Sequence, residues 1–206
     1  MYSRKPLGLA YPFRGKWLVQ NSPANRIPSH GTEVFASSNA IDFVPVDDRG
    51  VSAPITFRTL FRPEPPERFS GFGRPILSPA TGRIVARHDA LPDHPAYRGF
   101  PSVGYALTQR QRAAEGWPAL AGNYVGIDTG HGILFLCHLR RGSVKVEVGA
   151  RIGVGDVVAA CGNSGNSTEP HVHVQAVDNL DIDSARPVEI RFNGSLPRNG
   201  EVVDAG

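Results

Sequence analysis

The sequence predicts a mainly β domain built from short antiparallel strands, arranged as a two-sheet sandwich or in a barrel-like way. Three observations support this fold class. The 206-residue chain contains 23 glycines and 18 prolines, which are frequent turn formers. No apolar period typical of a helix is sustained over several turns. Instead, short runs rich in β-branched and other apolar residues alternate with turn residues, as they do in antiparallel sheets.

The expected strands follow one another along most of the chain. They are residues 16–20, 40–44, 55–60, 83–88, 124–128, 133–139, 157–161, 171–177 and 188–192. The short turn Gly130-His131-Gly132 separates two of these runs, 124–128 and 133–139. A connection of this kind predicts that the two runs pair as a hairpin.

Two stretches depart from this strand-and-turn pattern. Residues 89–121 form a long connection rich in Pro, Gly and charge, and the good helix formers at 106–114 predict one short helix within it. Residues 193–206 are polar and contain Gly and Pro, so they are expected to fray. We therefore expect a single domain over residues 1–206, with a core of about 16–192, an insertion of about 89–121 and a flexible tail of about 193–206.

Composition limits the function classes. The net charge of +3 is too small to argue for nucleic acid or another anionic polymer as a partner. No apolar run approaches the ~18 residues of a membrane span, and the N-terminal residues lack the continuous apolar region of a signal peptide. The two cysteines, Cys137 and Cys161, are too few for a disulfide framework. Buried free thiols are expected, with a single bridge as the alternative.

The most informative motif is His171-Val172-His173, which follows a loop rich in Gly, Asn and Ser. Side chains alternate along a strand, so the two histidines share one face. Two imidazoles held side by side on a rigid strand suit zinc binding and acid–base chemistry. The alternative is a chance pair on a solvated strand face.

Three more residues have informative surroundings. His30 lies in a loop after Pro28-Ser29, and Asp42 lies among apolar residues where a buried carboxylate needs a compensating cation or donor. By strand alternation His138 shares a face with Leu134 and Leu136. Each residue also has an alternative interpretation. His30 could be an ordinary loop histidine, Asp42 a solvated carboxylate at a strand end, and His138 a histidine of the core. The remaining histidines, His88, His94 and His131, occur in turn or loop contexts and are expected at the surface.

One histidine of the His171/His173 pair, together with His30 and Asp42, would provide three metal ligands and leave a fourth position open. That arrangement is typical of catalytic rather than structural zinc sites. The other histidine of the pair and His138 would then be available for acid–base work or for stabilising an oxyanion. The residues alone do not decide which histidine of the pair has which role.

Several motifs in this order resemble the LytM/lysostaphin-type zinc endopeptidases, which share the duplicated hybrid motif fold. The resemblance rests on residues 30, 40–43 (AIDF), 78–85 (SPATGRIV), 122–128 (GNYVGID), 138–144 (HLRRGSV), 148–149, 154–156 and 162–173 (GNSGNSTEPHVH). In one respect the chain departs from the family. The family's common first motif places the Asp four residues after the His, whereas eleven residues, Gly31 to Ile41, separate His30 from Asp42 here.

The resemblance implies an antiparallel β fold with one zinc ion in a groove, and hydrolysis of peptide bonds in peptidoglycan stems or cross-bridges by metal-activated water. It assigns His30, Asp42 and His173 as metal ligands and His138 and His171 as the catalytic histidines, with their individual roles left open. It also implies a peptide partner, no nucleic acid, a monomer, and a place in the cell envelope or outside the cell.

Two other function classes remain as alternatives. A non-catalytic relative could act as a binding or activator module of cell-wall hydrolysis, although such relatives typically lose ligands or catalytic histidines. A biotinyl- or lipoyl-carrier domain shares the Pro-Ala-Thr-Gly and Gly-Asp turns, but a carrier needs an exposed lysine on a hairpin tip. Lys145 is the one lysine in the second half of the chain, and it lacks carrier-like flanking residues.

Overall fold

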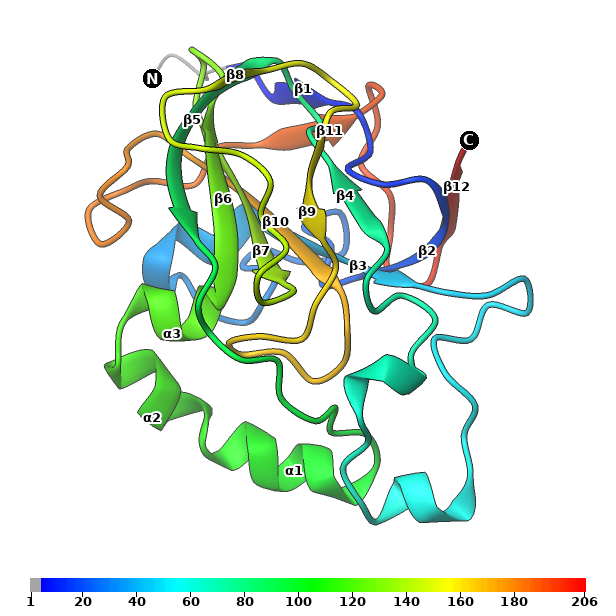
Figure 1. Ribbon diagram of the computed structural model, residues 1–206. Helices are drawn as coiled ribbons and strands as arrows, with labels where there is room; N and C mark the ends of the chain where they lie inside the picture. The colour runs from blue at the N-terminus through cyan, green and yellow to red at the C-terminus, as the bar shows by residue number, and fades with distance from the viewer. Residues whose placement is uncertain (1–4) are drawn as a thin grey trace.

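The computed structural model describes residues 5–206 and is built around one large antiparallel sheet (Figure 1). This sheet has eight strands, in the spatial order β12 (Val202–Ala205), β2 (Gly15–Gln20), β3 (Ile41–Pro45), β10 (Val172–Val177), β7 (Ile133–Leu139), β6 (Asn123–Asp128), β5 (Gly82–His88) and β8 (Arg151–Ile152). Each pair of neighbouring strands in this sheet is antiparallel. The two end strands do not pair with each other within residues 5–206, so the sheet stays open rather than closing into a barrel.

Two small sheets complete the β structure. The antiparallel pair is β4 (Pro75–Leu77) with β9 (Val157–Ala160), and the parallel pair is β1 (Leu7–Leu9) with β11 (Ile190–Phe192). The mainly β fold class and the 124–128/133–139 hairpin are therefore confirmed.

The two faces of the central strands have different environments. One face carries the main hydrophobic core, to which β3 contributes Ile41 and Phe43 and β10 contributes Val172 and Val174. The opposite face carries a smaller apolar cluster that includes Phe135, Cys137 and Val177. Because side chains alternate along a strand, residues such as Asp42 and His173 lie on this second face.

The helices are short and lie at the periphery. The connection before β6 contains three of them rather than the single predicted helix: α1 (Phe100–Leu107), α2 (Gln109–Ala114) and α3 (Trp117–Ala121). Figure 1 shows them as a chain of helices below the sheets. No helix in residues 5–206 is long and apolar enough to cross a membrane.

Two of the sequence-based expectations are wrong. Residues 55–60 are not a strand, because Thr56 and Thr59 cap each other reciprocally and begin the 3-10 helix η2 (Phe57–Leu60). A second 3-10 turn, η3 (Pro66–Arg68), follows it. The C-terminal residues expected to fray instead include β12, which pairs with β2 over Val202–Ala205 and extends the sheet.

Candidate metal and catalytic site

Asp42 and His173 meet across two central strands. They are direct partners in the antiparallel pairing of β3 with β10, so their side chains leave the same face of the sheet. His173 Nδ1 lies 2.9 Å from Asp42 Oδ1. Both side chains are largely buried, and the sheet ladder fixes their backbones. This pair forms the rigid part of the site.

The loop between His30 and Asp42 folds back so that the two residues meet in spite of their separation in sequence. It contains the 3-10 segment η1 (Val34–Asn39), and the Ser29 backbone N–H donates to the Ser38 carbonyl across it. Phe35 and Ala36 have φ of 58° and 57°, which turns the chain sharply. As a result His30 Nε2 lies 3.0 Å from Asp42 Oδ2.

The hydrogen bonds of His173 direct its Nδ1 towards Asp42. Gln175 Nε2 donates to the Phe35 carbonyl over 2.6 Å, which orients the amide. Gln175 Oε1 then accepts from His173 Nε2–H over 3.2 Å. The His173 ring therefore carries a proton on Nε2, and Nδ1 is the nitrogen that faces Asp42. In the neutral ring this Nδ1 and the Asp42 carboxylate are two acceptors at close range.

His30 is held in the same way on the other side of Asp42. The Ser29 hydroxyl donates to the Ser37 carbonyl over 3.2 Å, so its oxygen accepts from His30 Nδ1–H over 2.9 Å. His30 Nε2 then faces Asp42, and in the neutral ring it is an acceptor. Ligand atoms of His30, Asp42 and His173 all lie within 4.8 Å of one another. Acceptors that converge like this need a proton or a metal cation between them, and each outer ring nitrogen has the partner expected for a metal-binding histidine.

A β-bulge brings His138 onto this face. The pairing of β6 with β7 shifts register between Asn123 and Val125, and His138 has φ of 61°. Strand alternation predicted that His138 shares the face of Leu134 and Leu136, and this prediction is wrong. Leu139 joins those leucines in the main core instead, because the bulge adds one residue and turns His138 towards His171 and His173. A non-glycine residue in left-handed geometry is typical of functional sites.

His138 and His171 lie side by side next to the Asp42–His173 pair. Their ring centroids are 4.5 Å apart, and the His138 and His173 centroids are 5.8 Å apart. His138 Nδ1–H donates to the Ser164 carbonyl over 2.9 Å. His171 Nδ1–H donates to the Glu169 carbonyl over 2.8 Å. Because a carbonyl oxygen can only accept, Nδ1 carries a proton in both rings, and in the neutral ring Nε2 is the acceptor.

Electrostatics separate the roles of Asp42 and His138. Burial raises the pKa of the Asp42 carboxyl, but the positive charge of His30 and His171 when they are protonated, together with hydrogen bonds from His173 and His30, outweighs burial and holds that pKa well below its usual range. Asp42 therefore stays ionised. Burial and then the neighbouring His171 and His173 hold the pKa of His138 well below its usual range, so its imidazole is neutral.

The insertion before β6 contacts the loop that carries His171. His94 Nε2 lies 2.9 Å from the Gly165 carbonyl oxygen, and Tyr105 donates its hydroxyl proton to the same oxygen over 2.9 Å. In the same loop, Ser167 Oγ lies 3.0 Å from His171 Nδ1. His94 was expected to be a surface residue without a partner, and this expectation is wrong: it anchors the loop that fixes His171.

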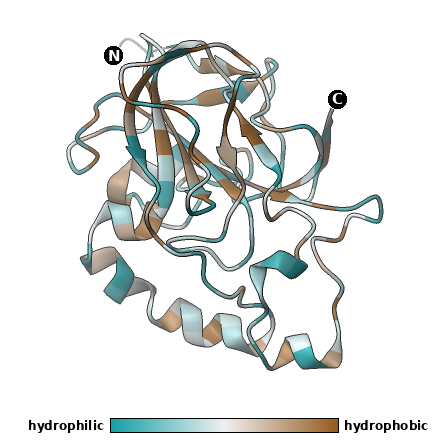
Figure 2. Cartoon of the chain, in the orientation of Figure 1, coloured by the Kyte–Doolittle hydropathy of each residue, from teal (hydrophilic) through white to brown (hydrophobic). Residues whose placement is uncertain are grey.

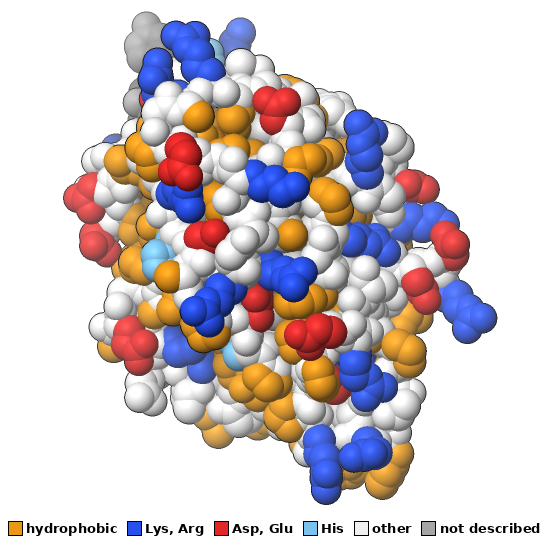
Figure 3. All heavy atoms as spheres, in the orientation of Figure 1, with side chains coloured by type: hydrophobic (Ala, Val, Ile, Leu, Met, Phe, Trp, Pro, Cys, Tyr) orange, Lys and Arg blue, Asp and Glu red, His pale blue; other side chains and the backbone are white. Residues whose placement is uncertain are grey.

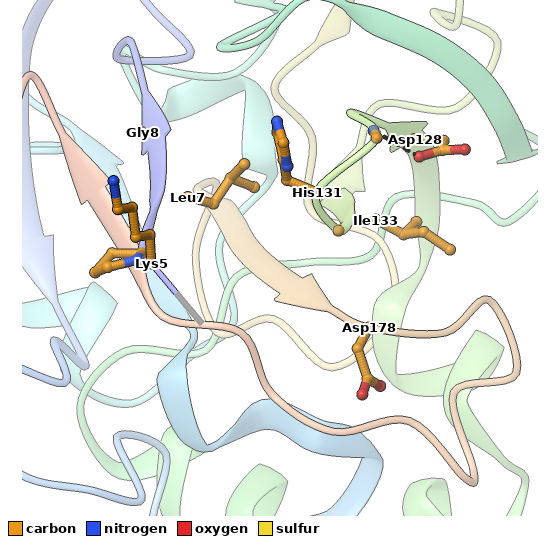
Figure 4. Close-up of a pocket in the computed structure, with 10 residues that line it drawn as sticks. Lys5, Leu7, Gly8, Asp128, His131, Ile133 and Asp178 are labelled. Atoms are coloured by element: carbon orange, nitrogen blue, oxygen red, sulfur yellow. Dashed lines mark hydrogen bonds between the residues drawn. The ribbon is translucent and has the colours of Figure 1, made fainter. Parts of the chain in front are cut away.

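A large cavity elsewhere does not belong to this site. It has a volume of about 790 Å³ and lies between the start of β1 and the β6–β7 turn. Figure 4 shows Lys5, Leu7, His131 and Asp128 around it. None of the five predicted site residues lines this cavity.

Residues 107–184 match the model of Peptidase family M23. This segment contains His138, His171 and His173, whereas His30 and Asp42 lie before it. The match confirms the resemblance to LytM/lysostaphin-type peptidases that the sequence motifs indicate.

Three solved structures illustrate what the chain is similar to. The catalytic domain of the antimicrobial peptidase lysostaphin from Staphylococcus simulans is 16% identical, with a TM-score of 0.39 over 72% of this chain and 73% of that chain. A mutant catalytic domain of the prophage-encoded M23 protein EnpA from Enterococcus faecalis is 15% identical, with a TM-score of 0.42 over 73% of each chain. A zinc containing peptidase from Vibrio cholerae is 16% identical, with a TM-score of 0.38 over 72% of this chain and 45% of that chain.

The structure brings all five predicted site residues together. Several residues that hold them were not predicted: Asn21, Ser29, Ser164, Ser167 and Gln175. Strand alternation could have revealed Gln175, which lies two residues after His173 on the same face. Asn21, whose amide donates to Asp42 Oδ2 over 2.7 Å, has no comparable signal in the sequence.

Proposed function

We propose that this chain is a zinc-dependent endopeptidase that hydrolyses peptide bonds in peptidoglycan stems or cross-bridges. The single observation that carries the proposal is that ligand atoms of His30, Asp42 and His173 lie within 4.8 Å of one another, beside His138 and His171, whose Nδ1 atoms are each engaged by a backbone carbonyl. The match of residues 107–184 to Peptidase family M23 supports the same class of reaction.

The donor set fits zinc. Two imidazole nitrogens and one carboxylate oxygen are borderline and hard ligands that zinc accepts, and three protein ligands are the usual number in a catalytic zinc site. His30, Asp42 and His173 would hold the ion. Such an ion would supply a Lewis acid that lowers the pKa of a bound water and polarises a carbonyl group.

The chain's own residues supply the proton transfers. With Nδ1–H engaged by a carbonyl, His138 Nε2 and His171 Nε2 can each accept a proton from water and later return it to the leaving amine. Once protonated, either Nε2–H can donate to the oxyanion of the tetrahedral intermediate. His171 Nε2 lies 3.7 Å from Asp42 Oδ1, so it faces the proposed metal site. The same geometry allows either division of roles.

A digest of muropeptides tests the proposal. Purified protein is incubated with muropeptides with and without a chelator, and zinc is then restored to the chelated sample. We expect cleavage of stem or cross-bridge peptide bonds, loss of cleavage with the chelator and recovery with zinc. Zinc-bound protein that cuts no wall peptide would refute the enzymatic proposal and favour a binding or activator module.

A further inference from the structure

Two helical segments that are distant in sequence meet and expose their aromatic side chains to solvent. Phe57 begins η2 and Phe61 directly follows it, and their ring centroids are 5.1 Å apart. Phe61 stacks on Phe100 at the start of α1 with centroids 5.3 Å apart. These are also the exposed phenylalanines within residues 5–206. Together with Ile55 and Val103 they form what we call the aromatic patch.

These side chains are exposed to an unusual degree. Phe57 is 78% exposed, Phe100 is 68% exposed and Ile55 is 71% exposed. Along α1 the spacing of Phe100, Val103 and Leu107 places them on one helix face, and all three are exposed. In Figure 2 brown, hydrophobic residues recur along both α1 and η2 at the lower edge of the molecule. Gathered apolar exposure of this kind marks an interaction surface.

The charges on the aromatic patch have one sign. Arg58 and Arg62 are exposed within or next to η2. Residues 49–63 and 94–114 contain no Asp or Glu. The next carboxylate along the chain, Glu64, is buried and paired with Arg98. Figure 3 shows blue and orange spheres side by side at the lower right, where η2 lies. The surface is therefore both apolar and basic.

We propose that the aromatic patch binds the surface of a membrane rich in anionic lipids. A lipid bilayer offers an anionic headgroup layer over an apolar interior, which complements arginines beside aromatic rings. Contact with a second copy of this chain fits less well. A symmetric dimer places the same patch on both sides of the interface, so Arg58 and Arg62 would meet their own copies with no carboxylate in the patch to pair with them. This binding does not depend on the proposed peptidase activity.

Vesicle flotation tests this proposal with the intact chain. One set of vesicles contains equal parts of phosphatidylglycerol and phosphatidylcholine, and the other contains phosphatidylcholine alone. We expect the protein to float with the anionic vesicles and much less with the neutral ones. The triple variant Phe57→Ser, Phe61→Ser, Phe100→Ser should bind roughly tenfold more weakly or worse. Each of Arg58→Gln and Arg62→Gln should weaken binding by roughly fivefold.

Matched variants outside the patch control for nonspecific effects. Val148→Ser and Val154→Ser replace exposed apolar residues elsewhere, and Arg151→Gln removes an exposed charge in β8, an end strand of the large sheet. All three should bind like the unmodified protein. Circular dichroism checks that each variant is folded. Failure to float with anionic vesicles, or equal flotation of the folded triple variant, would overturn the proposal. Self-association without lipid that the triple variant abolishes would overturn it in favour of a second copy.

Discussion

Asp42 and His173 face each other across β3 and β10, and His173 Nδ1 lies 2.9 Å from Asp42 Oδ1. Because the two residues are cross-strand partners, the sheet itself sets the separation of these proposed ligands. His30 is added from a loop on one side, and His138 and His171 lie on the other. If some of these residues bind the metal and others act as catalytic groups, mutations of the two kinds should affect zinc content and activity differently.

Replacing His173 and His138 should have different consequences for zinc. His173→Ala removes a proposed ligand and should lose zinc together with activity. His138→Ala should keep zinc and lower activity by roughly 100-fold to 10,000-fold, since it removes an acid–base group. Metal analysis and peptide hydrolysis measured on the same preparations check both effects. Full zinc occupancy in His173→Ala would contradict the ligand assignment.

Gln175 should tune metal affinity through His173. Its Oε1 accepts the His173 Nε2 proton, and removal of such a partner typically weakens metal binding by roughly 10-fold to 100-fold. Gln175→Ala should show that loss in a competitive titration with a zinc chelator. Gln111→Ala, at an exposed position of α2, serves as the control and should bind zinc like the unmodified protein. Equal affinity of Gln175→Ala and the control would refute this role.

His94 should act as a positioning residue for His171. Without its ring, the Gly165 carbonyl keeps Tyr105 but loses the His94 contact, and the loop can shift. We expect His94→Ala to retain zinc and to lower kcat by roughly 10-fold to 100-fold. His131→Ala, at an exposed turn, should leave kcat unchanged. If His94→Ala lost zinc in proportion to its activity, a general structural effect would be the better explanation.

Position 165 requires glycine because the backbone there passes very close to the backbone at Gly122. Gly165 has φ of +72°, and a Cβ there would lie 2.4 Å from the Gly122 nitrogen. Gly165→Ala should therefore lower the free energy of unfolding by roughly 3 kcal/mol or more, combining backbone strain with the steric clash. Gly155→Ala is a matched control, because φ is +89° there but no atom lies within 4 Å. Gly155→Ala should lower the free energy of unfolding by only ~1–2 kcal/mol. Urea unfolding that gives equal losses for both variants would contradict the steric argument.

The two cysteines should be unreactive in the folded protein. Both are free and buried, and burial raises the pKa of each thiol above its usual value. A thiol reagent at about pH 8, close to the usual cysteine pKa, should therefore label neither residue until denaturant is added, when Cys137 and Cys161 should both react. Rapid labelling of the native protein, or no labelling after unfolding without reductant, would contradict this prediction.

Strand positions were predicted well from the sequence because alternation and turn residues are local signals. The run 133–139 matches β7 over its full length, and Asp42, His171 and His173 were placed on the correct strands or strand ends. The helices before β6 were less predictable, since short helices depend on contacts with the rest of the fold. Likewise β12 is stabilised by pairing with β2, which the polar residues before it, with their Gly and Pro, do not reveal.

The site depends on features that alternation alone does not show. The bulge at His138 reverses the face expected from strand periodicity. The fold-back of residues 31–41 depends on hydrogen bonds from Ser29 and Gln175 to carbonyls of η1. The bulge and the fold-back both depend on contacts between residues that are distant in sequence. The order of the motifs could therefore indicate the proposed ligand set, but the sequence could not give the geometry of the site.

The most direct test of the proposed metal centre is the zinc content of His30→Ala beside that of the unmodified protein. His30 is the proposed ligand that departs from the family's usual spacing, and it reaches Asp42 only because its loop folds back. We predict one zinc ion per unmodified chain and severe loss of zinc in a folded His30→Ala variant. An unmodified chain that binds no zinc, or a His30→Ala variant that keeps full occupancy, would contradict the proposed His30–Asp42–His173 centre.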